Sequence, residues 1–169
     1  YMVLGISLDN ESGLAGSIVH MFNHAVIKGG LFMVMAAVVL RTGSADISAM
    51  RGLAKRMPWT YLGFVIGGLG LIGVPLTAGF VSKWYLVLGA LDREYVWVVV
   101  VLLLSSLLNV FYLLPVAVRA FFRNENDDEE GEGCIKEAPW QCVVPLSCTA
   151  LGCFGLFFFS DVLLSLAGL

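Results

Sequence analysis

The sequence predicts an all-α integral membrane protein with about five transmembrane helices, one of which is broken. Of the 169 residues, 59% are hydrophobic and only 14% are charged, whereas soluble domains are typically about 45–50% apolar and about 25% charged. Apolar runs recur along the chain, and several reach the roughly 20 residues that a helix needs to cross a bilayer. The net charge of −3 gives no indication of nucleic-acid binding.

The first complete span is predicted over residues 16–40. Ser12, near its start, is a candidate N-cap, because a serine hydroxyl can accept from a first-turn amide. Residues 1–8 look like the end of an earlier span. The polar and basic residues 42–57 are interpreted as a loop, and a hairpin there is the only sheet structure we expect. Since the chain starts at Tyr1 inside an apolar phrase, we expect a C-terminal piece of a longer protein, or one half of a split protein.

The next apolar stretch, residues 59–91, is too long for one straight crossing. As a single helix it would extend about 50 Å, whereas the hydrocarbon core is about 30 Å thick. Gly73 and Pro75 are expected to interrupt it, since proline lacks the N–H that a continuing helix needs. We therefore predict two short spans, 59–73 and 74–91.

The rest of the chain adds two spans to a single membrane domain. Residues 95–122 are predicted as one helix, bent at Pro115. Residues 123–138 form an acidic loop that is expected to be solvated. Residues 140–159 are the last predicted span, and the short apolar tail at 162–169, capped by Ser160 and Asp161, is expected to lie in the membrane interface.

Two familiar motif types are set aside. Residues 68–73 (GLGLIG) match G-x-G-x-x-G, but a dinucleotide site also needs a soluble βαβ unit and an acidic residue about 20 positions later. Close helix packing through small residues is the preferred interpretation. The four cysteines form no CxxC pair, so neither a metal site nor a cofactor is predicted.

Three titratable side chains in the first span share one helix face. His20, His24 and Lys28 are spaced i, i+4, i+8, with about 6 Å of rise between neighbours. Lys28 lies near the middle of the span, where a charged lysine costs roughly 2.5–3.5 kcal/mol. A water-filled cavity, a carboxylate on another helix or a neutral amine would offset this cost. The cluster is interpreted either as a proton relay or as buried polar contacts that join helices.

Lys83 lies near mid-depth in the predicted span 74–91, just after residues that weaken the helix. Pro75, Thr77 and Gly79 all precede it within eight positions. Transporters build ion sites from broken helices with a charge at the break, which makes Lys83 a candidate proton carrier. The alternative is a lysine at a helix end that reaches the membrane interface.

A few uncharged polar residues are candidates for lining a water path beside these cations. They are Asn23, Thr77, Ser82 and Asn109. Hydrogen bonding between helices explains them equally well. No acidic residue lies inside any complete span, so a partner carboxylate is expected on other sequence or on another subunit.

Three motifs in order resemble the proton-antiporter-like membrane subunit family. They are HMFNHAVIKGGLF, MRGLAKRMPW and GVPLTAGFVSKWYLVLGAL. The family includes components of Mrp-type Na⁺(K⁺)/H⁺ antiporters and the antiporter-like components of complex I and of membrane hydrogenases. GFVSKWYL looks most like the D-type component of Mrp antiporters, since its complex I counterpart often has a glutamate in place of Lys83. The resemblance covers roughly residues 1–122.

The resemblance implies that the chain is the C-terminal part of a 14-helix subunit, with its spans corresponding to helices 10 to 14. Lys83 then matches the lysine of broken helix 12. Lys28, His24 and His20 match polar residues of helix 10 on the central hydrophilic axis.

The implied function is proton translocation in a multisubunit monovalent cation/proton antiporter, with protons relayed along these lysines and histidines. The alternative is a proton-pumping subunit of complex I (NADH:quinone oxidoreductase) or of a related hydrogenase, and a third is a structural subunit without transport. No active site is expected on this chain. The expected partners are other membrane subunits, lipid, protons and monovalent cations, without nucleic acid, and the expected location is a bacterial or archaeal plasma membrane.

Overall fold

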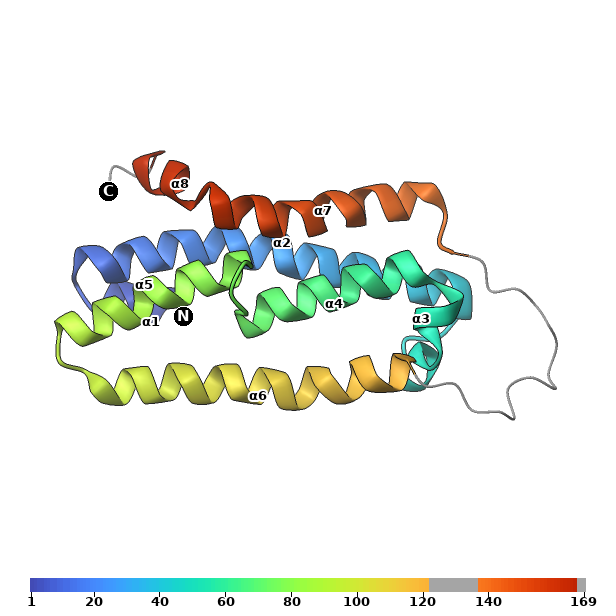
Figure 1. Ribbon diagram of the computed structural model, residues 1–169, viewed down its shortest axis with the longest axis horizontal. Coiled ribbons are helices and arrows are strands. Elements are labelled where there is room, and N and C mark those ends of the chain that lie inside the picture. Colours follow the sequence, from blue (N-terminus) through green and yellow to red (C-terminus); the bar gives the residue numbers. More distant parts are fainter. Residues whose placement is uncertain (122–136, 167–169) are drawn as a thin grey trace.

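The computed structural model describes residues 1–121 and 137–166, and no strand occurs within these ranges. Three helices are long and apolar enough to cross a membrane, namely α2, α6 and α7. The predicted all-α membrane fold is confirmed. The described elements, drawn in Figure 1, are α1 (Met2–Ser7), α2 (Glu11–Thr42), the 3₁₀ turn η1 (Ile47–Met50), α3 (Leu53–Arg56), α4 (Pro58–Ile72), α5 (Ala78–Asp92), α6 (Val96–Phe121), α7 (Trp140–Phe158) and α8 (Ser160–Leu166).

Helix α2 is the long central element, and it starts earlier than the predicted span. Its N-cap is Asn10, whose side-chain oxygen accepts from the Gly13 amide at 2.9 Å. The prediction of Ser12 as N-cap is therefore wrong. The Ser12 hydroxyl instead donates to Asp92 Oδ2 at 3.2 Å, because the helix has already begun at that position.

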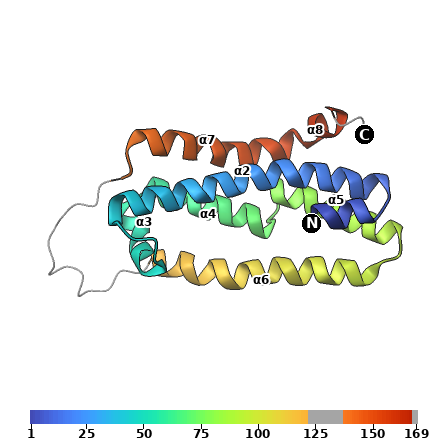
Figure 2. The same cartoon turned by 180° about the vertical axis from the view of Figure 1, so that it is seen from behind.

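Helices α4 and α5 lie in line, as two halves of one broken rod that runs antiparallel to α2. Figures 1 and 2 show this from opposite sides. Contacts follow α2 in order from its later to its earlier residues, through the pairs Leu31–Gly67, Ile27–Gly70, Asn23–Ala78, His20–Ser82, Gly16–Leu86 and Asn10–Gly89.

The structure has one helix in each of the predicted ranges 59–73 and 74–91, and it places these two helices in line. Each half-helix has 15 residues, about 22 Å, which is shorter than a hydrocarbon core of about 30 Å. Helix α2 has 32 residues, about 48 Å, so both halves fit along it. The break therefore lies partway along the rod that the two halves form, and the number of membrane crossings in residues 59–91 stays a prediction.

The linker between the half-helices is a tight turn with an unusual residue in it. Gly73 ends α4 in the left-handed region, with φ of 85°. Val74 to Thr77 then form a turn closed by the Thr77 N–H donating to the Val74 carbonyl at 3.1 Å. Pro75 and Leu76 occupy its middle positions, and Leu76 has φ of 75°, the type II arrangement that normally uses glycine. A left-handed residue with a Cβ costs roughly 1–2 kcal/mol.

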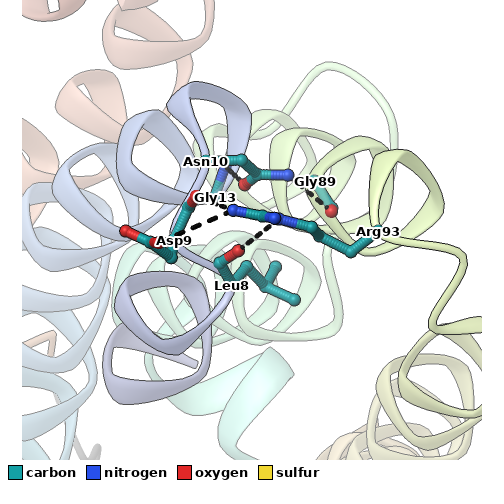
Figure 3. A network of polar contacts seen from close by, with 6 residues as sticks. All are labelled: Leu8, Asp9, Asn10, Gly13, Gly89 and Arg93. Carbon is teal, nitrogen blue, oxygen red and sulfur yellow. Dashed lines mark hydrogen bonds and ion pairs between the residues drawn. The ribbon is translucent and has the colours of Figure 1, made fainter.

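A polar network ties the far end of α5 to the α1–α2 turn (Figure 3). Arg93 Nε donates to the Leu8 carbonyl at 2.9 Å, Arg93 Nη2 donates to the Asp9 carbonyl, and the Asp9 carboxylate lies 3.6 Å away. Asn10 Nδ2 donates to the Gly89 carbonyl at 2.7 Å. One end of the broken rod is therefore fixed against the start of α2.

The remaining helices complete the fold around this pair. Residues 47–50 and 53–56 form η1 and α3, so the expected hairpin in the 42–57 loop is wrong. Helix α6 continues through Pro115. Residues 122–136, which include most of the predicted acidic loop, lie outside the described residues.

We predict opposite outcomes for two Gly→Ala changes. A Cβ on Gly79 would lie 1.9 Å from the Gly70 carbonyl oxygen, whereas a Cβ on Gly29 in α2 would have no neighbour within 4 Å. Gly79→Ala should cost at least about 1–3 kcal/mol through overpacking. Gly29→Ala should be neutral or stabilising, because alanine favours helix by about 1 kcal/mol. Thermal unfolding of the purified protein measures both, and equal melting temperatures would contradict the packing at the break.

Candidate functional site

Lys83 lies on the second turn of α5 and reaches back across the break to α4. Its Nζ donates to the carbonyls of Ile72 at 2.6 Å and Leu71 at 3.1 Å, and to Ser106 Oγ on α6 at 2.8 Å. Side chains of a helix tilt toward its N-terminus, so a lysine one turn into α5 points to the end of α4. The interpretation of Lys83 as a lysine at the membrane interface finds no support in these contacts.

The carbonyls that hold Lys83 are those that the end of a helix leaves open. The last four carbonyls of a helix lack intrahelical partners and carry the negative end of its macrodipole, about −0.5 charge. In α4, the Leu69 carbonyl accepts from two linker amides, and Lys83 takes those of Leu71 and Ile72. The helix end therefore supplies negative charge to Lys83, which forms no ion pair with a carboxylate within residues 1–121 and 137–166.

Three neighbours shape this cation site. Asn109 Nδ2 on α6 also donates to the Leu71 carbonyl, at 3.3 Å. Gly73 leaves room for the lysine chain, since a Cβ there would lie 2.9 Å from Lys83 Cδ. The Tyr1 ring lies 5.4 Å from Lys83 Nζ, within the range of a cation–π contact. The sequence indicates Asn109 as a polar candidate, whereas it gives no signal for the roles of Tyr1 and Gly73.

His20 connects α2 to the residue next to Lys83. Its Nδ1 lies 3.0 Å from the Ser82 hydroxyl, which can also donate to the Gly79 carbonyl at 3.2 Å. The His20 ring lies 4.8 Å from the Tyr1 ring and stacks on the His24 ring at 5.7 Å. Both rings therefore share one face of α2, and this face leads toward the break.

Two other predicted path residues hold the break together. Asn23 Nδ2 donates to the Ala78 carbonyl at the start of α5. Its Oδ1 is buried and has no hydrogen-bond partner among the described residues, so it can accept a hydrogen bond from a water molecule. The Thr77 hydroxyl donates to the Val74 carbonyl at 2.6 Å, which closes the linker turn.

Lys28 lies next to this cluster on α2 but is not bonded to it. It is half-buried, one turn beyond His24 on α2, and no hydrogen bond or ion pair joins it to any residue in 1–121 or 137–166. Its role in a relay with His20 and His24 stays a prediction. Within the same ranges, no three His, Cys, Asp or Glu side chains gather in a way that could hold a metal ion.

Glu137 lies three residues before the start of α7 at Trp140. It falls in the loop that the sequence predicts to be solvated. Its carboxylate instead accepts from the backbone N–H of Trp59 and the hydroxyl of Thr60, at the start of α4. The only sequence signal was its position just ahead of an apolar run, after many other acidic residues.

An apolar helical bundle with a lysine set against the open end of a broken helix is an arrangement that membrane transporters use to build ion sites. The chain belongs to the family described as "NADH:quinone oxidoreductase/Mrp antiporter, TM", whose match covers residues 1–109. The resemblance inferred from the three motifs is thereby confirmed.

The relatives include both branches of that family. The chain is 38% identical to NADH-quinone oxidoreductase subunit N of Desulforudis audaxviator, over 98% of this chain and 35% of the relative. It is 33% identical to the D-type component of the Na(+)/H(+) antiporter of Alkalihalophilus pseudofirmus, over 77% of this chain and 26% of the relative. In the Mrp complex from Dietzia sp. DQ12-45-1b, one chain shares the fold with a TM-score of 0.86 and 22% identity, over 99% of this chain and 39% of that chain. The chain thus spans well under half the length of each of these proteins.

We predict that Gly73→Ala destabilises the protein through two separable effects. Its φ of 85° imposes a backbone cost of roughly 1–2 kcal/mol on any residue with a Cβ, and the new methyl group also displaces Lys83. In a Lys83→Ala background the second effect is absent, so the loss of melting temperature should be smaller. An equal loss in both backgrounds would show that Lys83 does not pack against Gly73.

Proposed function

We propose that the chain carries the lysine switch of a proton-translocating subunit in a multisubunit monovalent cation/proton antiporter of the plasma membrane. The observation that carries this proposal is the Lys83 ammonium bound to the Leu71 and Ile72 carbonyls and to Ser106. Backbone carbonyls accept hydrogen bonds but cannot take up a proton. Lys83 can therefore be held in its charged form without being locked into a salt bridge.

The geometry supports a proton step centred on Lys83. When Lys83 is charged, its three hydrogen bonds join α5 to α4 and α6. When it releases its proton, the attraction to the end of α4 falls to that of a neutral amine. On one side, His20 and His24 approach the break through Ser82, and Asn23 offers an unpaired oxygen. Intervening waters at these polar groups would complete a relay, with Lys28 as a further member on the same face of α2.

The alternative branch of the family also has a specific observation in its favour. The NADH-quinone oxidoreductase relative matches this chain at higher identity and over more of its length than the Na(+)/H(+) antiporter relative does. In that case the same lysine would serve a proton pump driven by electron transfer in other subunits. Purification of the complete native complex separates the two, because only one of them contains redox subunits.

We predict that Lys83→Ala lowers proton-coupled exchange by about a hundredfold or more, which is within the range lost with a proton-transferring group. Lys83→Arg should also fail, because guanidinium keeps its proton. Lys83→Glu should keep part of the activity, since a carboxylate can titrate. The measurement is dissipation of a pH gradient in vesicles that hold the complete complex. Exchange at the wild-type rate by Lys83→Arg would reduce Lys83 to a fixed structural charge.

We further predict that Lys28→Ala slows proton-coupled exchange and leaves assembly of the complex largely intact, because Lys28 has no hydrogen-bond partner in the described chain. The same vesicle assay measures the rate, and the yield of purified complex reports assembly. Lys55→Ala, a change at an exposed lysine of α3, is the control. If Lys28→Ala and Lys55→Ala exchange at the same rate, Lys28 is not part of the relay.

A further inference from the structure

Glu137 contacts the end of α4 that lies opposite to the Lys83 site. Its Oε2 accepts from the Trp59 N–H at 2.9 Å, and its Oε1 accepts from the Thr60 hydroxyl at 2.6 Å. Both residues lie in the first turn of α4, directly after Pro58, which has no N–H to satisfy. Glu137 therefore caps α4 although it belongs to the segment that leads into α7.

The cap is itself fixed in place by its surroundings. Arg41 Nη2, in the last turn of α2, donates to the Glu137 carbonyl at 2.6 Å. The Ala138 N–H donates to Glu137 Oε1 at 3.2 Å. Ala138 is buried in the apolar cluster that also contains Met57 and Phe64. Glu137 thus joins α4 to α2 and to the start of α7 at one point.

Helix α4 transmits the position of its first turn to its last. A helix of 15 residues behaves as a stiff rod, so an axial shift at Trp59 reappears at Ile72. The hydrogen bonds from Lys83 to Ile72 and Leu71 are 2.6 and 3.1 Å long. Because such bonds normally lie between about 2.7 and 3.2 Å, the first is already short and the second is near the long limit, so a displacement of α4 weakens one or the other.

We propose that Glu137 is a positioning residue for Lys83: by capping the start of α4, it sets where the open carbonyls at the end of α4 meet the lysine. This inference rests on the proposed function of Lys83 and adds a residue to it. It also assigns a role to an acidic residue outside the spans. Glu137 would act through hydrogen bonds and not as a carrier of protons.

The test compares Glu137→Ala with Glu137→Gln in the complete complex, by dissipation of a pH gradient in vesicles. Alanine removes the cap, and we expect exchange about tenfold slower, equivalent to about 1.4 kcal/mol. Glutamine can accept from Trp59 and donate to the Thr60 oxygen but cannot accept from the Ala138 N–H on the same side, so we expect it to restore part of the rate. Glu94→Gln, the same change at an exposed glutamate, controls for the loss of charge.

Two outcomes would overturn the proposal in this assay. An unchanged rate for Glu137→Ala would mean that the cap does not position Lys83. A rate for Glu137→Gln as low as for Glu137→Ala would mean that the two hydrogen bonds that glutamine keeps, to Trp59 and Thr60, do not position α4. If Glu137→Ala does not assemble, Thr60→Val takes its place, because it removes one hydrogen bond of the cap. A slower rate is then expected, and an unchanged rate counts against the proposal.

A second measurement separates positioning from ordinary stabilisation, and it does not require Lys83 to cycle a proton. Melting temperatures are compared for Glu137→Ala, Lys83→Met and the double variant. Distant independent sites add, so a purely structural cap gives a double loss equal to the sum. We expect a smaller loss than the sum, because without Lys83 the end of α4 has no partner to meet. An additive result would overturn the positioning role, whereas failure of the proposed function alone would leave the coupling intact.

Discussion

The contact between the Lys83 ammonium and the open carbonyls of α4 is the interaction on which the rest of this structure depends. Either partner alone would be costly in a membrane. Unsatisfied carbonyls in hydrocarbon cost several kcal/mol each, and a central lysine costs roughly 2.5–3.5 kcal/mol. Each cost is offset by the other group, so the broken helix and the half-buried charge stabilise each other.

Helix α2 makes this contact possible because both half-helices pack along it. Glycines allow these helices to approach closely. A Cβ on Gly13, Gly16 or Gly89 would come within 3.0 Å of a neighbouring atom, either across the α2–α5 contact or in the adjoining α1–α2 turn. Polar contacts then fix the two ends of the rod, through Arg93 at one end and Glu137 at the other. The charge lies between two anchored ends, where a small change in the linker has the largest effect.

Composition was enough to predict the all-α membrane fold, and the helix-breaking residues Gly73 and Pro75 lie in the observed linker. They could not show that the halves of residues 59–91 lie in line, because folding back and continuing both need the same glycine and proline. Ser12 and Asn10 are both good caps, and only the packing of Asn10 on α5 decides between them. The two carbonyl partners of Lys83 could not be predicted, because backbone carbonyls carry no signature in the sequence. The relay through Lys28 stays a prediction.

The linker turn at Val74–Thr77 has a consequence for how the break can change shape. Type II and type I turns differ mainly in the orientation of their middle peptide plane. A flip of the peptide between Pro75 and Leu76 would move Leu76 out of its left-handed conformation, with φ of 75°, into a region that suits its side chain. The flip keeps the turn ends in place and unwinds neither helix. The strain at Leu76 therefore lowers the difference in free energy between two shapes of the same four residues.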